Sequence, residues 1–337
     1  MAQKLGIALI GLGRIARLSH FTNILCHPKL DLKYVVDKDT AMASNFIKQY
    51  RNDIEVLPPS DLQTVLEDKS LDATFICTPA DSHEEYIKAS LNSGKAVFCE
   101  KPLTTDEAST QSCYAVAKKH GLLLFCGFNR RFDPSISSLC RRVKEGEIGQ
   151  IKDIRTIVRD KNLQPIEYLK ISGGIFTDCV VHEFDLVGWL MGCLPSVIYA
   201  QGHAWVEELR EFDDVDHAFV VMKYPSGAIV SIDAGRGTKY GNDHRMEIHG
   251  SNGVCLQREA VYPTSVVSLG DSGELRENRY ADHYTLWRDS FEAELEHFVN
   301  ALQGKSENVV TAEECKNIAK VIAACNESLK TGQPVKL

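Results

Sequence analysis

The chain has 337 residues, of which 44% are hydrophobic and 25% are charged, and its formal net charge at pH 7 is −8. These values are typical of a soluble globular protein that is long enough for two domains, each with its own core. The negative charge and the lack of a basic run argue against nucleic acid or an anionic membrane as a partner. No apolar run is long enough to span a bilayer.

In chain order, the first part of the sequence alternates strand and helix patterns. Buried strands of a parallel sheet are predicted at residues 7–10, 32–36, 73–77, 96–99 and 122–126. The amphipathic stretches 82–93 and 106–120 are predicted helices that end near Gly94 and Gly121, which suit helix C-termini. This order predicts an α/β fold with a dinucleotide-binding Rossmann domain over residues 1–126.

The pattern changes after a predicted crossover at 127–134 and a helix at 135–145. Alternating runs then predict strands at 154–158, 197–206, 217–224, 228–234 and 245–249. One helix is predicted at 178–191, and two more at 287–302 and 312–331. We expect residues 127–337 to form an α+β domain around a large, mostly antiparallel open sheet, with terminal helices that could pack on the first domain.

The eleven cysteines do not indicate a disulfide framework or a zinc site. Their number is odd, no Cys-x-x-Cys pair occurs, and Cys77, Cys99, Cys126 and Cys179 lie in apolar patterns. Buried, reduced thiols in a cytoplasmic protein account for this better. The N-terminus leads into a predicted strand without a signal peptide, which also favours a cytoplasmic location.

A Gly-x-Gly-x-x-Ala turn follows the first predicted strand. Gly11 permits a tight turn, Gly13 lets the backbone approach a pyrophosphate, and Ala16 allows close helix–strand packing. Although such a turn can be purely structural, the order strand, glycine turn, helix, strand, acid favours a bound dinucleotide. Asp37 would accept hydrogen bonds from the adenosine ribose and so predicts NAD, although the adjacent Lys38 keeps NADP possible. The predicted cofactor-binding residues here are Gly11, Gly13, Arg14, Ile15, Ala16, Asp37 and Lys38.

Two further features could carry chemistry. Lys101 follows the fourth strand, so it could meet a nicotinamide ring and a substrate hydroxyl, or be a surface lysine before Pro102. Asp178 and His182 are four residues apart and would share one face of a helix; the alternative is a helix-start aspartate and a core histidine. A metal site of Asp178, His182 and Asp185 is not expected, because all three would lie on one helix and a nicotinamide site needs no metal.

Together, these segments resemble the Gfo/Idh/MocA oxidoreductases over nearly the whole chain. The glycine turn, Cys77-Thr78-Pro79 with His83, Glu100-Lys101-Pro102 and the Gly-Gly-x-x-x-Asp-x-x-x-His run at 173–182 occur in the family's order. Residues 127–133, 159–160, 172–176 and 242–247 resemble the inositol 2-dehydrogenase branch, although Ser172 stands where many members have glycine. The resemblance implies a homodimer or homotetramer through the open sheet, and it adds Thr78, Pro79, His83, Glu100 and Lys101 to the cofactor site.

The resemblance also implies that Lys101, Asp178 and His182 are catalytic. In oxidation of a secondary hydroxyl, His182 would be the general base, Lys101 would polarise the oxygen, and Asp178 would orient the substrate or hold His182. Whether Lys101 or His182 takes the proton first stays open. The expected substrate is a small cyclic polyol or sugar, most of all inositol. Its predicted binding residues are Lys101, Arg159, Asp160, Asp178, His182, Asn242 and His244, whereas Arg130 and Arg131 could equally be structural.

Two other functions are compatible with these residues. A glycosidase that keeps NAD tightly bound would show no net NADH formation, and a sensor could retain the cofactor site without catalysis. The presence of Lys101, Asp178 and His182 together argues against the sensor.

Overall fold

The structure is a computed structural model that describes residues 4–259, 261–264, 267–270, 273–276 and 279–337. The chain forms two compact units. The first unit is Met1–Asn129 with Asp289–Lys316, and the second is Arg130–Arg288 with Asn317–Leu337. Among the described helices, none has the length and apolar character that a membrane crossing requires.

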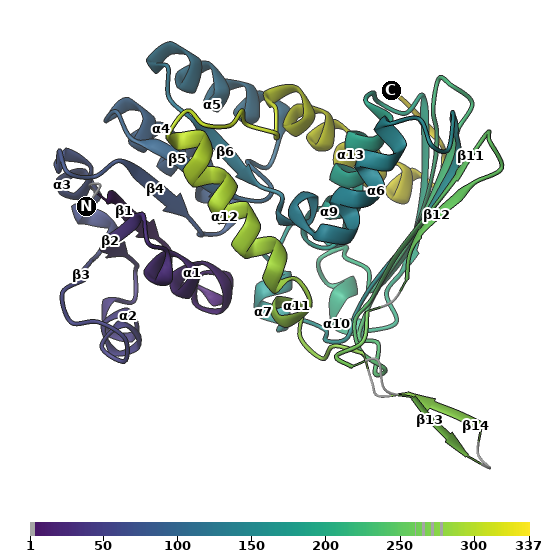
Figure 1. The fold of residues 1–337 in the computed structure, drawn as a ribbon, viewed down its shortest axis with the longest axis horizontal. Helices are drawn as coiled ribbons and strands as arrows, with labels where there is room; N and C mark the ends of the chain where they lie inside the picture. Colours follow the sequence, from purple (N-terminus) through teal and green to yellow (C-terminus); the bar gives the residue numbers. More distant parts are fainter. Residues whose placement is uncertain (1–3, 260, 265–266, 271–272, 277–278) are drawn as a thin grey trace. The chain divides into compact units, whose positions relative to one another are not determined.

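The first unit contains a six-stranded parallel sheet with the order β3-β2-β1-β4-β5-β6 (Figure 1). Its strands are β1 (Leu5–Ile10), β2 (Leu30–Val36), β3 (Glu55–Leu57), β4 (Ala73–Ile76), β5 (Ala96–Glu100) and β6 (Leu124–Gly127). The helices of its N-terminal segment are α1 (Phe21–Cys26), α2 (Thr40–Ile47), α3 (Leu62–Glu67), α4 (His83–Asn92) and α5 (Glu107–His120), with a π-helical turn, η1 (Ala16–His20), before α1. The Rossmann fold is therefore confirmed.

Aromatic rings tie a late segment of the chain to this sheet. Phe75, Phe98 and Phe125 on neighbouring strands stack with centroids 4.6 and 5.4 Å apart. Phe298 on α12 (Arg288–Leu302) meets all three edge-on at 5.1 to 5.8 Å. Because all four rings are fully buried, this cluster holds α12 in the core of the first unit.

The second unit contains a seven-stranded sheet with the order β12-β11-β7-β10-β9-β8-β15. Only β10 and β7 pair in parallel among its described strands, so the expected mostly antiparallel sheet is confirmed. The strands are β7 (Ile151–Asp160), β8 (Val197–His203), β9 (His217–Lys223), β10 (Ile229–Arg236), β11 (Asp243–Gly250), β12 (Cys255–Arg258) and β15 (Val335–Lys336). A separate hairpin pairs β13 (Val267–Gly270) with β14 (Gly273–Arg276).

The large sheet has two different faces. Alternate residues of β7, β9 and β11 are buried, and we call their side the inner face. Helices α6 (Pro134–Lys144) and α9 (Val181–Met191) lie to one side of the sheet (Figure 1). The remaining positions form the outer face, where Tyr199, Phe219 and Val221 are large apolar residues exposed by 39 to 52%.

The remaining helices of the second unit are short, except at the C-terminus. They are α7 (Ile166–Leu169), α8 (Ile175–Asp178), α10 (Glu207–Arg210) and α11 (His283–Leu286). The long helix α13 (Ala312–Thr331) belongs to the second unit from Asn317 onward. Strand β8 ends at His203 rather than at residue 206 as predicted, because Asp216 accepts hydrogen bonds from the backbone of Trp205 and Val206 and turns the chain there.

Candidate functional site

The glycine turn joins the ends of three neighbouring strands. Gly11 has a φ of +88°, and its amide donates to the carbonyl of Val36 at 2.7 Å. A Cβ atom at Gly11 would lie 2.9 Å from the backbone oxygen of Cys77, so only glycine fits this approach. Gly13 and Arg14 are exposed where the helix begins, and Ala16 is buried. This open helix start suits the pyrophosphate of a dinucleotide.

Asp37 is held by the same turn. Its Oδ2 accepts from the Leu12 amide at 2.6 Å and its Oδ1 accepts from the Asp39 amide at 2.8 Å. The half-buried carboxylate is therefore fixed at the carboxyl end of β2, with lone pairs left for ribose hydroxyls. Lys38 beside it is exposed.

His83 connects the loops that follow β4 and β5. Its Nε2 lies 2.9 Å from the carbonyl of Thr78 and its Nδ1 lies 2.9 Å from the carbonyl of Pro102. Burial lowers the pKa of His83 below its usual value, against the opposing effect of these carbonyl groups. Thr78 also accepts from the Ser82 hydroxyl at 2.8 Å. His83 thus connects two loops through its two ring nitrogens. Thr78 and Pro79 follow the carboxyl end of β4, where they are partly or fully exposed.

A buried pair precedes Lys101. The Nε2 atom of His20, in the π-helical turn, lies 2.6 Å from Oε1 of Glu100, and Oε2 accepts from the Lys101 amide at 3.0 Å. Burial alone would raise the pKa of Glu100, but the hydrogen bond and the charges of His20 and Lys101 lower it below its usual range. Glu100 is 6% exposed, and its carboxylate positions the backbone of Lys101. Lys101 itself is partly exposed.

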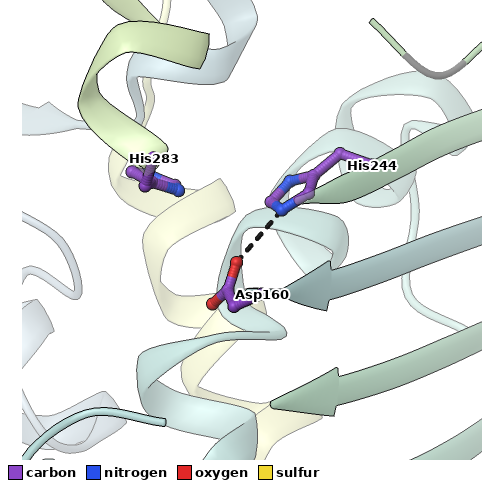
Figure 2. Close-up of side chains that lie close together, drawn as sticks. All are labelled: Asp160, His244 and His283. Atoms are coloured by element: carbon purple, nitrogen blue, oxygen red, sulfur yellow. Dashed lines mark hydrogen bonds and ion pairs between the residues drawn. The ribbon is translucent and has the colours of Figure 1, made fainter. Parts of the chain in front are cut away.

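In the second unit, Asp160 at the end of β7 and His244 on β11 form a pair on the inner face (Figure 2). His244 Nε2 lies 3.0 Å from Asp160 Oδ1, and the Cys179 thiol lies 3.6 Å from Asp160 Oδ2. Burial, with the charge of Arg130, lowers the pKa of His244 to about 4. Burial would raise the pKa of Asp160, but His244, His283 and Arg130 lower it instead.

These shifts fix the protonation of the pair near neutral pH. Asp160 is a carboxylate and His244 is a neutral imidazole that donates its Nε2 proton to Asp160. The Nδ1 atom of His244 is then an acceptor, and it is buried with no hydrogen-bond partner among the described residues. This arrangement offers one acceptor and one anion to a ligand.

His283 links this pair to His182. The His283 ring lies 6.0 Å from the His244 ring and 6.3 Å from the His182 ring, measured between centroids. Asp160, His244 and His283 each offer one potential ligand atom, and these three atoms lie within 4.8 Å of one another. Figure 2 shows the three side chains converging from β7, β11 and α11. The structure therefore brings three predicted residues, Asp160, His182 and His244, into one region, together with His283, which sequence reasoning missed.

Asp178 differs from its predicted place on one helix with His182. It ends α8, and the turn at Cys179 and Val180 separates it from α9, so the shared-face prediction is wrong. Helix α8 begins after Gly174, which has a φ of +83°, and the Ile175 amide donates to Asp214 at 2.8 Å. At the interruption, the Val180 amide bonds to the Ile175 carbonyl, five residues earlier, at 2.9 Å. Tyr168 donates to Asp178 Oδ1 at 2.8 Å and Arg236 lies 3.5 Å from Oδ2.

Two predicted substrate residues do not join this region. Arg159 pairs with Asp233 on the outer face, because neighbouring residues of a strand point to opposite sides and Asp160 points inward. Asn242 is buried, where its Oδ1 accepts from the Lys161 amide at 2.9 Å and its Nδ2 donates to the Tyr280 carbonyl at 3.1 Å. Its amide therefore connects two loops.

The two arginines of the crossover make buried ion pairs with helix α9. Arg131 makes a buried bidentate pair with Asp185 on α9 at 2.6 and 2.9 Å. Arg130 pairs with the buried Glu183 on the same helix and lies over the Trp287 ring at 4.8 Å. Asp185 is thus engaged by Arg131.

Comparisons with known proteins match two parts of the chain to the two domains of one family. Residues 5–128 match the model described as the oxidoreductase family, NAD-binding Rossmann fold, and residues 141–337 match the C-terminal alpha/beta domain of the same Gfo/Idh/MocA family. The chain is 33% identical to the myo-inositol 2-dehydrogenase of Thermotoga maritima over 98% of each sequence. It is 31% identical to the scyllo-inositol 2-dehydrogenase (NAD(+)) of Bacillus subtilis, covering 100% of this chain and 97% of that protein.

A solved structure has the same fold. The scyllo-inositol dehydrogenase of Lactobacillus casei, with bound NAD(H) and scyllo-inositol, superposes with a TM-score of 0.90 at 25% identity, covering 99% of each chain. The chain therefore belongs to the Gfo/Idh/MocA family of oxidoreductases, and residues 5–128 form its NAD-binding domain.

Proposed function

We propose that this chain is an NAD-dependent dehydrogenase of cyclic polyols that oxidises a secondary hydroxyl of inositol to give an inosose. The observation that carries the proposal is the buried pair of Asp160 and His244, with His283 and His182 beside it. The printed names of relatives over the full chain point to the same substrate class.

The first unit has the features that NAD requires. Bound NAD would accept the hydride that leaves the carbinol carbon. The helix start at Gly13 and Arg14 would hold its pyrophosphate, with Ile15 and Ala16 in the first turn, and Asp37 its adenosine ribose. Thr78 and Pro79 lie after the neighbouring strand β4, on the other side of the point where the strand order reverses. His83 and Glu100 would act on this site by positioning these loops and Lys101.

The chain's own residues handle the proton. Loss of the hydride makes the hydroxyl proton acidic, and a base near its working pH must accept it. We assign this role to the Nε2 or Nδ1 atom of His182, which is 5% exposed in α9. Lys101 would polarise the substrate oxygen with its ammonium group, and Asp178, held by Tyr168 and Arg236, would bind an adjacent hydroxyl.

The polar cluster fits a ligand with several hydroxyls. A hydroxyl can donate to the carboxylate of Asp160 or to the buried Nδ1 acceptor of His244. Leaving a buried group of this kind unpaired costs about 1–3 kcal/mol, so an apolar alcohol would bind poorly. Because Arg159 and Asn242 are engaged elsewhere, their proposed contribution is to shape the sheet and loops around the cluster.

We also propose that two or four copies of the chain associate through the outer face of the large sheet. Tyr199, Phe219 and Val221 are exposed there on adjacent strands. Exposed apolar groups gathered on one sheet face are typical of protein interfaces.

The test is NADH formation with a panel of inositols, aldoses and simple alcohols. We expect NAD reduction with myo- or scyllo-inositol and weaker activity with aldopyranoses. Activity confined to acyclic or apolar alcohols would contradict the proposal. Release of a phenol from aryl glycosides without net NADH would instead indicate a glycosidase.

A further inference from the structure

A second group of potential ligands lies on the outer face of the large sheet, at the end formed by β7, β11 and β12. Glu247 and His249 are two residues apart on β11, so both point outward. The strand register places Cys255 of β12 directly opposite His249. These three side chains are partly or fully exposed, and no step of the proposed reaction uses them.

We propose that Glu247, His249 and Cys255 bind one zinc ion. One ligand atom from each residue lies within 4.8 Å of the others. Glu247 Oε1 and His249 Nε2 are 3.3 Å apart. Two donors at the usual Zn–O and Zn–N distances of about 2.0–2.1 Å lie about 3.3–3.4 Å apart in a tetrahedral site, so this pair already has the required separation. The exposed Cys255 can bring its sulfur closer by rotating about its Cα–Cβ bond.

Neighbouring side chains orient both strand β11 ligands. His249 Nδ1 lies 2.9 Å from Asp153 Oδ1, so Nδ1–H can donate a hydrogen bond to the carboxylate, which leaves the lone pair of Nε2 for the metal. Gln257 donates to Glu247 Oε2 at 2.9 Å, which leaves Oε1 facing His249. A carboxylate behind a metal-binding histidine is a regular feature of zinc sites.

The charges at this place favour a cation. Two carboxylates lie here: Glu247 is a proposed ligand, and Asp153 contacts the ligand His249. Arg155 is the basic residue paired with both carboxylates, but its side chain is 66% exposed and can turn into solvent. The cluster of Asp160, His244 and His283 contrasts with this. Burial, together with the charges of Arg130 and Arg258, lowers the pKa of His244 there, and the same positive charges would repel a dication.

The donor set indicates zinc rather than magnesium or calcium. Thiolate and imidazole are ligands that zinc prefers, whereas the hard cations prefer oxygen. Binding converts the Cys255 thiol to a thiolate and releases one proton to solvent, and water fills the fourth position. The ion would link the edge strand β12 to β11. The sequence lacked a zinc signature because its two strands supply the ligands by pairing, not by close spacing.

The experiment uses the reduced, chelator-treated full-length protein and Co²⁺ as a coloured substitute for zinc. We expect one equivalent to bind with a thiolate-to-cobalt charge-transfer band and the visible bands of a tetrahedral site, all displaced by Zn²⁺. Cys255→Ser should abolish the charge-transfer band. The matched control is Cys193→Ser, which removes another exposed cysteine and should leave the spectrum unchanged.

Further variants separate direct ligands from positioning residues. His249→Gln should weaken Zn²⁺ binding, measured by competition with a chelating dye, by at least as much as Asp153→Asn, for which we expect a 10- to 100-fold loss. The proposal would be overturned if the cobalt–thiolate band persisted in Cys255→Ser, or if it were lost in Cys193→Ser or in His283→Gln. It would also be overturned if the wild-type protein showed no cobalt–thiolate band. Since none of these readouts involves polyol oxidation, the result is independent of the proposed activity.

Discussion

Single side chains in both units are positioned by more than one neighbour. Asp37 is fixed by two backbone amides, and His83 connects two loops through both ring nitrogens. His244 uses one nitrogen for Asp160 and keeps the other as an acceptor. Such groups are held before a ligand arrives, so replacing one of them should change a defined and measurable property of the protein.

The catalytic assignment predicts a selective loss of turnover. Lys101→Ala and His182→Ala should each lower kcat by about 100- to 10,000-fold, because each removes a group that handles charge at the reacting oxygen. NAD affinity, measured by fluorescence titration, should stay nearly unchanged. The combined loss in the double variant should be smaller than the product of the two if the groups act as one unit.

Exposed residues of α5 provide controls for these variants. Lys119→Ala and His120→Ala remove the same side-chain types from the surface of the first unit and should leave kcat unchanged. A His182→Ala protein with near-normal kcat would show that this histidine is only part of the core.

Asp37 predicts the choice between NAD and NADP. Its carboxylate repels a 2′-phosphate and accepts from the ribose hydroxyls, so kcat/KM should be higher with NAD. Asp37→Ser removes the repulsion, and the adjacent Lys38 can then meet the phosphate, so the preference should shift toward NADP. The measurement is kcat/KM for both cofactors with one polyol. Equal or higher wild-type values with NADP would refute the assignment.

The depressed pKa of His244 predicts a pH-dependent stability. The ordinary pKa of 6.5 applies in the unfolded chain and the folded value is about 4, so the unfolded state binds more protons between these values. Stability from neutral His244 is therefore present above pH 6.5 and is lost as the pH falls toward 4, by about 3 kcal/mol at most. Urea denaturation of wild type and His244→Gln should show their difference shrinking over this window. A constant difference would contradict the neutral imidazole.

At the scale of elements, the short helices around the site were the least predictable part. The apolar pattern from Ile175 onward predicts one helix, yet the chain breaks it at Cys179 and Val180. The start of the first short helix depends on Asp214, a residue distant in sequence that accepts from the Ile175 amide and pairs with Arg236. Periodicity reports only local preferences, so it could not reveal this tertiary contact.

Helix α9 should depend strongly on its buried ion pair. Asp185 and Arg131 are each 1% exposed, so Asp185→Asn removes the carboxylate that pairs with this guanidinium in the interior. We expect the free energy of unfolding to fall by about 3–5 kcal/mol, measured with urea. The double replacement Arg131→Met with Asp185→Leu should cost less, since it removes both charges.

The exposed pair of Arg141 on helix α6 and Glu145, the residue directly after that helix, is the control. Glu145→Gln should change the free energy of unfolding by about 0.5 kcal/mol or less. An equally small effect of Asp185→Asn would mean that the buried pair does not anchor α9.

For the whole molecule, the sequence predicts the layers better than the contacts. Parallel strands such as β1 and β4 are buried on both sides and appear as continuous apolar runs, so they were found. Strand β3 was missed because its three residues, Glu55–Leu57, carry too short a pattern. His283 was missed because its polar surroundings before α11 contain no local signal, and only the fold places it beside His182. The inward and outward directions of Asp160 and Arg159 could have been inferred from the strand period.

The outer face of the large sheet predicts an assembly of identical chains. On a sheet face that contacts solvent, the outward-pointing residues are normally polar. On β9, however, the outward residues Phe219 and Val221 are 52% and 45% exposed, and Tyr199 lies opposite Val221 on β8. By light scattering, wild type should have two or four times the chain mass of 37.5 kDa. The double variant Phe219→Glu with Val221→Glu should be a monomer, because its charges would be buried without partners. Leu18→Glu, at an apolar residue of the first unit that is 56% exposed, should keep the wild-type mass. If the double variant retains that mass with an unchanged circular dichroism spectrum, this face is not the interface.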